Sequence, residues 1–128
     1  MKVTKQINCD DATEGDCEDL LELVNENDYN IQVTGNNPDP SSPFPGSPPP
    51  TGTDVTLGPG DYQVTETTAT SLFDHVNTFF LTHPFTPVTL GFPSFTGDCN
   101  GISSFQATGT IAVGESQTCN IINSITTG

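Results

Sequence analysis

Residues 57–68 read Leu-Gly-Pro-Gly-Asp-Tyr-Gln-Val-Thr-Glu-Thr-Thr, a turn sequence that runs directly into alternating apolar and polar positions. Gly and Pro are strong turn formers, and successive side chains of a strand point to opposite faces of a sheet. The alternation therefore predicts a strand whose inward face is formed by Tyr62, Val64 and Glu66. Val55 and Leu57 alternate in the same way before the turn, so we expect a β-hairpin around residues 58–61.

The same alternation recurs toward both ends of the chain. It predicts a first strand at residues 2–7, whose inward face carries Val3, Lys5 and Ile7. A turn at Gly114-Glu115 separates two further apolar stretches, which predicts a second hairpin and a last strand that returns toward the first. A further strand is predicted from alternation at Tyr29, Ile31 and Val33. The strand before the turn at Gly114-Glu115 carries Thr108, Thr110 and Ile111, and the last strand carries Cys119, Ile121 and Asn123.

Length and composition place these strands in one domain, residues 1–128. The chain is 32% hydrophobic with 11 Pro and 12 Gly, which is typical of many short strands joined by turns. We expect an all-β fold, a single Greek-key β-sandwich. At most one short helix is predicted, at residues 18–24, inside an acidic run from Cys9 to Asp28.

Two segments do not fit the strand pattern. Residues 37–53 are nearly all Pro, Ser, Gly and Thr, which predicts an extended surface loop that packs no core and could carry O-glycans. Residues 72–95 form an aromatic and Pro-rich insertion, which Pro84, Pro87 and Pro93 divide into short pieces. Its apolar side chains are candidates for the core or a sheet edge, and Phe79 and Phe80 are candidate partner contacts.

The net charge of −14, from 2 Lys, no Arg and 16 carboxylates, excludes nucleic-acid binding because phosphates would be repelled. It also disfavours an anionic membrane surface. No stretch approaches the roughly 18 apolar residues of a membrane helix, so direct membrane insertion is not expected. Met1 leads straight into a strand pattern without a basic and then apolar leader, so targeting has to be inferred indirectly.

The four cysteines form two pairs that are local in sequence, Cys9 with Cys17 and Cys99 with Cys119. Zinc binding is the alternative, but no Cys-x-x-Cys occurs and both histidines lie far from either pair in sequence. Two disulfides are favoured, which predicts an oxidising compartment and a secreted, cell-surface protein.

Three polar residues fall on strand faces that otherwise read as buried: Lys5, Glu66 and Asn123. Burial lowers the pKa of a Lys and raises that of a Glu, so a neutral Lys5 amine would be a nucleophile and a protonated Glu66 could polarise the Asn123 amide. If the three meet, the amine can displace ammonia and form an isopeptide bond in a single turnover. The alternative is a partly buried Lys5–Glu66 ion pair, with Asn123 capping an edge.

Three stretches resemble the prealbumin-like, Cna-B-type (SpaA-like) domains of bacterial and archaeal surface proteins, including pilins and stalk repeats. They are Val-Thr-Lys at 3–5, the stretch at 57–68 quoted above, and Gly-Glu-Ser-Gln-Thr-Cys-Asn-Ile-Ile-Asn at 114–123. In that family a Lys, a Glu and an Asn at these motif positions form an internal isopeptide, which implies that role for Lys5, Glu66 and Asn123. The resemblance also implies a prealbumin- or Ig-like sandwich and supports a Cys99–Cys119 disulfide. It covers less than half of the chain.

Other candidate sites are weaker. Asp10, Asp11, Glu14 and Asp16 could offer oxygen ligands to calcium, but their spacing does not match a known calcium loop, so a solvated acidic face is favoured. His75 and His83 have no nucleophile partner, and no hydrolase, zinc-protease or phosphate-loop motif occurs. We therefore expect neither a cofactor nor a turnover enzyme.

These observations favour an extracellular structural module, either the subunit of a surface filament or one repeat of a stalk. Its partners would be neighbouring repeats or copies of itself, joined head to tail. The strand at residues 2–7 could be donated to the next copy, which makes Lys2 and Val3 candidate contacts. An adhesin-type module that binds carbohydrate or protein is the alternative.

Overall fold

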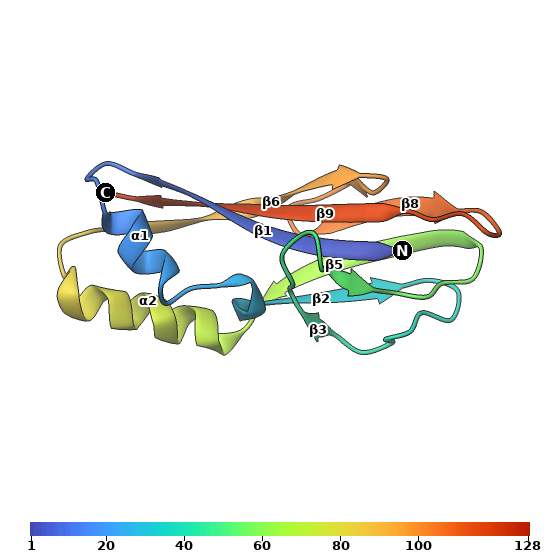
Figure 1. Cartoon of the computed structure of the whole chain (residues 1–128), viewed down its shortest axis with the longest axis horizontal. Coiled ribbons are helices and arrows are strands. Elements are labelled where there is room, and N and C mark those ends of the chain that lie inside the picture. The colour runs from blue at the N-terminus through green and yellow to red at the C-terminus, as the bar shows by residue number, and fades with distance from the viewer.

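The computed structural model describes residues 1–128 and is a β-sandwich of two sheets with two α-helices at one end (Figure 1). One sheet has the strand order β4-β1-β9-β6 and the other β3-β2-β5-β8-β7. The strands are β1 Lys2–Asp11, β2 Tyr29–Thr34, β3 Phe44–Pro45, β4 Thr53–Asp54, β5 Gly60–Thr68, β6 Val88–Gly97, β7 Asn100–Gly101, β8 Gln106–Ile111 and β9 Thr118–Thr127. The predicted β-sandwich is confirmed.

The first and last strands of the chain are parallel neighbours in the centre of the four-stranded sheet. Their register runs without a break from Lys2 opposite Thr118 to Asp11 opposite Thr127. This confirms that the last strand returns to the first. Because the two strands run in the same direction, the N- and C-termini lie toward opposite ends of the long axis (Figure 1).

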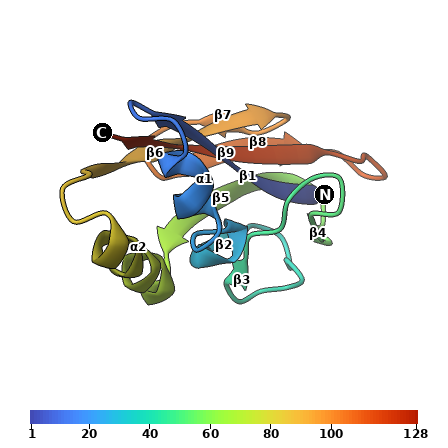
Figure 2. The same ribbon diagram turned by 60° about the vertical axis from the view of Figure 1, so that its left-hand side comes forward.

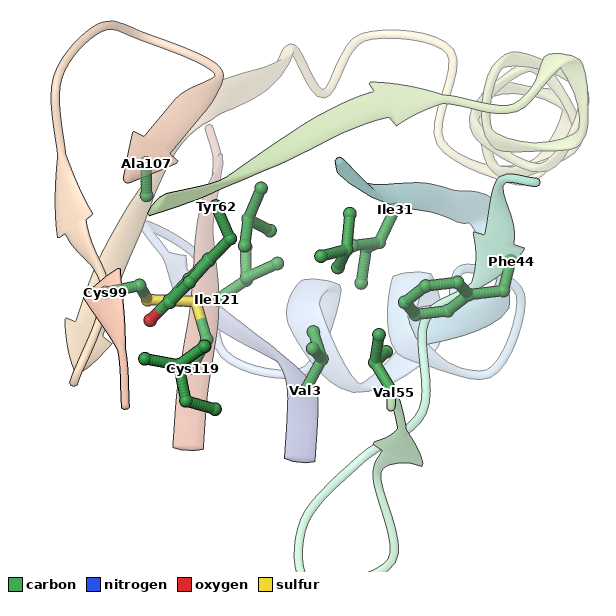
Figure 3. Close-up of a cluster of buried hydrophobic side chains, with 12 residues drawn as sticks. Val3, Ile31, Phe44, Val55, Tyr62, Cys99, Ala107, Cys119 and Ile121 are labelled. Carbon is green, nitrogen blue, oxygen red and sulfur yellow. A yellow bond between two sulfur atoms is a disulfide. The ribbon is translucent and has the colours of Figure 1, made fainter. Parts of the chain in front are cut away.

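A core cluster of 12 residues fills the space between the two sheets over the N-terminal half of β1. Figure 3 shows it, with the Cys99–Cys119 disulfide at one end and Phe44 at the other. The alternation predicted for Tyr62 and Val64 on β5 and for Cys119 and Ile121 on β9 places these side chains inward. Burial of such side chains is the main source of stability of a small sandwich.

Two helices close the other end of the sandwich, near the C-terminus (Figure 2), and a 3₁₀ turn after the first of them leads into β2. They are α1 Asp16–Leu21, η1 Glu26–Asp28 and α2 Thr70–Thr82. A second core cluster lies beneath them and contains Leu20, Val24, Tyr29, Leu72, Val76, Phe79 and Ile125. The expected helix at 18–24 is therefore present, although it begins two residues earlier and ends at Leu21.

The helix α2 corrects two predictions. At most one short helix was expected, and residues 72–95 were predicted to be an insertion that prolines divide into short pieces, yet α2 has 13 residues. Leu72, Val76 and Phe79 recur at the i, i+4, i+7 spacing of a helix face, and the first proline of the segment, Pro84, comes only after the helix ends. Phe79 is 1% exposed, so it is a core residue and not a contact surface; Phe80 is half-buried.

Neither predicted hairpin forms. β4 pairs with β1, whereas β5 pairs with β2 and β8, so the turn at residues 55–59 crosses from one sheet to the other. The turn at residues 112–117 likewise joins β8 to β9 in the opposite sheet. Alternation identifies a strand with one buried face, but it does not identify the neighbour to which that strand bonds.

The Pro-rich segment at residues 37–53 is not purely a surface loop. It contains β3, which pairs with β2, and its Phe44 is 7% exposed within the main core cluster. Gly46 then passes so close to Lys5 that a Cβ at Gly46 would lie 2.8 Å from the Lys5 Cγ. The segment therefore covers one side of the core and of Lys5, contrary to the prediction that it packs no core.

Asp28 fixes the start of α2 to the rest of the fold. Its buried carboxylate accepts hydrogen bonds from the Ser71 hydroxyl (2.7 Å), the Asn25 backbone N–H (3.0 Å) and the His75 ring (2.9 Å). Burial raises the pKa of this carboxyl, but the hydrogen bonds from Ser71, Asn25 and His75 outweigh it and hold the pKa below its usual value. The carboxylate thus stabilises the fold above the pKa of an unfolded Asp and loses this effect as the pH falls through the lowered pKa.

We expect Asp28→Asn to lower the free energy of unfolding by about 1–3 kcal/mol at neutral pH, because the amide cannot accept all three hydrogen bonds. The difference from the parent chain should shrink as the pH falls below about 4, where this carboxyl is protonated in the unfolded chain, and should vanish below the lowered pKa of folded Asp28. Urea unfolding at pH 7 and pH 3 measures both values. Asp74→Asn on the exposed side of α2 is the control. A difference that is the same at both pH values would contradict this role.

Candidate functional site

Lys5 lies inside the sandwich with 0% of its surface exposed. Its amine is 4.2 Å from the centre of the Tyr29 ring, and Gly46 packs against its aliphatic stem. Burial lowers the pKa of Lys5 to about 8, although the nearby Glu66 carboxyl opposes this shift. About one tenth of the amine is therefore neutral at pH 7, and only the neutral form is a nucleophile.

Glu66 reaches the same point from the facing sheet. It lies on β5 and is 2% exposed, and its Oε2 is 3.7 Å from the Lys5 Nζ. Burial raises the pKa of Glu66, while Lys5 and a hydrogen bond from Asn123 act in the opposite direction. The Glu66 Oε2 is the one buried side-chain polar atom without a hydrogen-bond partner.

Asn123 lies between these two groups. It is 2% exposed, its Nδ2 donates to the Glu66 Oε1 (2.9 Å), and its Oδ1 accepts from the Lys5 Nζ. In the parallel register Lys5 stands opposite Ile121, so Asn123 is the next inward-facing residue along the adjacent strand. The structure thus brings together all three polar residues that the sequence places on buried faces.

A cleft of about 470 Å³ opens onto one side of this triad. Glu66 and Asn123 line it, whereas Lys5 does not. The remaining lining comes from the end of β5, from α2, from β6 and from the segment before β8: Thr67, Thr68, Phe73, Leu90, Gly91, Phe92 and Phe105. The cleft could not be predicted from the sequence, because its walls come from four separate segments.

Both predicted disulfides are present. Cys9–Cys17 joins β1 to α1, and Cys99–Cys119 joins the turn between β6 and β7 to β9. No cysteine is free, which removes the zinc alternative for these residues. Two disulfides indicate an oxidising environment.

The other predicted site residues lie outside the triad. No group of three or more His, Cys, Asp or Glu side chains is arranged to hold a metal ion, and this includes the candidate calcium ligands Asp10, Asp11, Glu14 and Asp16. Lys2 donates to the Pro50 carbonyl (3.1 Å), and Val3 is 1% exposed in the core. Both belong to β1, which pairs with strands of its own chain.

Comparisons of the chain with protein-family models, curated proteins and solved structures give no match. No helix of the structure is long and apolar enough to span a membrane. The resemblance to Cna-B-type domains stays a prediction from the quoted motifs, and the function has to be inferred from the site itself.

We expect the two disulfides to contribute unequally to stability. Replacing Cys99 and Cys119 together by Ser should cost about 3 kcal/mol, because their bond closes the longer loop, 20 residues against 8, and is deeply buried. Replacing Cys9 and Cys17 should cost roughly 1 kcal/mol less. Urea unfolding of the two double variants, both kept oxidised, measures this order. The reverse order would show that α1 depends on its disulfide more than the core does.

Proposed function

We propose that this chain is an extracellular structural module of a surface filament or stalk, stabilised by its two disulfides and by an isopeptide bond between Lys5 and Asn123. The observation that carries the proposal is the buried triad, in which a Lys amine and an Asn amide are in contact beside a Glu carboxyl. A buried Lys–Glu pair contributes little net stability without such chemistry.

The reaction consumes one amine and one amide. The neutral Lys5 Nζ attacks the Asn123 Cγ, a new Nζ–Cγ amide bond forms, and the Cγ–Nδ2 bond breaks. The Glu66 carboxyl hydrogen-bonds the leaving nitrogen, so it can give its proton to Nδ2 and take one from the attacking Nζ. Nδ2 leaves as ammonia, and Glu66 ends with the number of protons with which it began.

A crosslink at this position suits a module that carries tension. Lys5 lies near the N-terminus and Asn123 near the C-terminus, on the two parallel central strands. A force applied at the two ends of the chain would pass through residues 1–5, the new bond and residues 123–128. The residues between them would bear no load, so the module would resist extension without relying on hydrogen bonds between strands.

The proposed partners are further copies or repeats arranged end to end. Phe85 is 96% exposed and Leu81 is 81% exposed at the end near α2, and Val113 is 85% exposed in the β8–β9 turn toward the other end (Figure 1). Apolar groups at both ends support head-to-tail contact. Strand donation is a second way to join the copies: β1 of one copy takes the place of β1 in the sheet of the next copy.

The crosslink predicts the mass of the intact protein. After disulfide reduction, the folded chain should weigh less than its sequence by one ammonia molecule. Glu66→Gln should slow the loss by about 100-fold or more, because the amide does not shuttle a proton. Asn123→Ala should abolish it, whereas the control Asn120→Ala on the same strand should leave it unchanged.

A full sequence mass in the folded parent chain would refute the internal bond. Covalent multiples of the chain that lack ammonia would instead place the bond between copies. Lys2→Arg, at the only other lysine, distinguishes the two amines, because it should change neither result.

The rate of bond formation should depend on pH with a maximum. The reactive pair is a neutral Lys5 amine beside a protonated Glu66 carboxyl, and it holds the same number of protons as the Lys5–Glu66 ion pair. It therefore exists in the pH range between the two pKa values of this pair. The rate should fall above about pH 8, where the pair loses its last proton, and again at acidic pH, where Lys5 is held charged. Chain purified in denaturant and diluted into buffers of different pH, then sampled by mass spectrometry, gives the profile. A rate that keeps rising well above pH 8 would show that Glu66 acts without its proton.

A further inference from the structure

The Pro-rich segment lies directly against Lys5. The Lys5 backbone N–H donates to the Ser47 carbonyl (2.9 Å). One residue earlier, the Gly46 N–H donates to the carbonyl of Tyr29 (2.9 Å), whose ring centre is 4.2 Å from the Lys5 Nζ. A Cβ at Gly46 would lie 2.8 Å from the Lys5 Cγ and 2.9 Å from its Cβ, so the lysine stem touches the Gly46 backbone. Further along the same segment, β4 pairs with the start of β1.

Two buried side chains anchor this segment, residues 44–55, at its ends. Phe44 is 7% exposed and Val55 is 1% exposed, and both point into the main core cluster (Figure 3). Between them residues 48–51 are exposed, so they add little buried surface. Near Lys5 the segment is therefore held by Phe44, by the short pairing of β3 with β2 and by a few backbone hydrogen bonds. Segments with few buried contacts open at a lower free energy than the core does.

The position of this end of the segment decides the surroundings of the lysine. When it is seated, the Lys5 stem is held by Gly46, and the amine lies against the Tyr29 ring and in contact with the Asn123 amide. When it is open, the stem is uncovered on that side and the lysine can reach water, where the charged form is favoured. Orientation and desolvation of a nucleophile each contribute to its reactivity. Only the seated arrangement supplies both.

We propose that Phe44 is a positioning residue for the Lys5–Asn123 reaction: it seats residues 44–47 over the lysine, and the bond forms only while they are seated. This inference rests on the proposed function and adds a control step to it. The covalent step is unchanged, with the Nζ–Cγ bond formed, the Cγ–Nδ2 bond broken and ammonia released. Its rate depends in addition on how often the segment is closed, which no member of the triad determines.

Hydrogen exchange tests whether this end of the segment opens on its own. The Asn123→Ala chain is used, because it cannot form the bond and therefore reports the state before the reaction. After correction for intrinsic rates, the Lys5 amide should exchange by local opening, about tenfold or more faster than the Glu66 amide. The Glu66 amide donates to the Phe105 carbonyl in the facing sheet (2.9 Å) and should exchange only when the whole domain unfolds.

Two further core variants in that chain separate local opening from overall stability. Phe44→Ala should speed the exchange of both amides, because Phe44 leaves the core in both events. Ile111→Ala should speed only the Glu66 amide, since Ile111 is 5% exposed in the same core cluster but lies on β8, which pairs with β5 and β7. Phe44→Ala should also raise the pKa of Lys5 from about 8 toward its ordinary value, as NMR titration measures. Neither variant changes the other titratable groups beside the lysine, which are Glu66, Tyr29 and Glu26.

Bond formation is then followed by mass in chains that keep Asn123. Phe44→Ala should slow the loss of ammonia about tenfold at pH 7, because each unit by which the Lys5 pKa rises leaves tenfold less neutral amine. The fall in rate at alkaline pH should move to higher pH, which a loss of stability alone does not cause. Phe44→Leu keeps a buried apolar side chain and should restore most of the rate. Ile111→Ala is the matched control and should leave the rate and its pH profile unchanged.

The outcomes distinguish this role from the bond itself. Ammonia loss in the parent chain at a rate and pH profile that Phe44→Ala leaves unchanged would overturn the role of Phe44 and keep the bond. Equal slowing by Phe44→Ala and Ile111→Ala would also overturn it, because stability would then explain both. A parent chain that loses no ammonia would overturn the bond, and the positioning role with it.

Discussion

The burial of a lysine beside a glutamate is the constraint on which the rest of this structure depends. An isolated buried charge costs several kcal/mol, so Lys5 is tolerated only because Glu66 and Asn123 meet it inside the sandwich. These three side chains come from the first strand, a central strand of the facing sheet and the last strand. The two sheets must therefore pack in one alignment, since a slip of one residue on any of the three strands would turn its polar group out of the site.

The same constraint explains why the site is closed on one side and open on the other. Gly46 and Tyr29 cover the Lys5 side, and a side chain at Gly46 would collide with the lysine stem. The Pro-rich segment therefore has a structural role that its composition conceals, because one glycine and one buried Phe44 anchor it. On the opposite side, Glu66 and Asn123 reach the cleft.

Much of the site could be predicted from sequence because strand alternation is a local signal. The inward positions of Lys5, Glu66 and Asn123 follow from the period of two, and the local cysteine pairs follow from spacing. The pairing of strands could not be predicted from the sequence, because a turn that crosses between sheets and a hairpin turn are built from the same types of residue. The helix α2 was missed because its Phe and Thr content favours strands, while packing against Leu20 and Tyr29 decides its conformation.

The cleft also resolves a conflict within the proposed chemistry. A dry site favours the neutral amine and the protonated carboxyl, yet the reaction must release ammonia and exchange protons with solvent. Glu66 and Asn123 line the cleft and Lys5 does not, so the residues that release and protonate the leaving nitrogen border the opening, while the nucleophile stays desolvated. The geometry that protects the amine is thus compatible with the departure of its product.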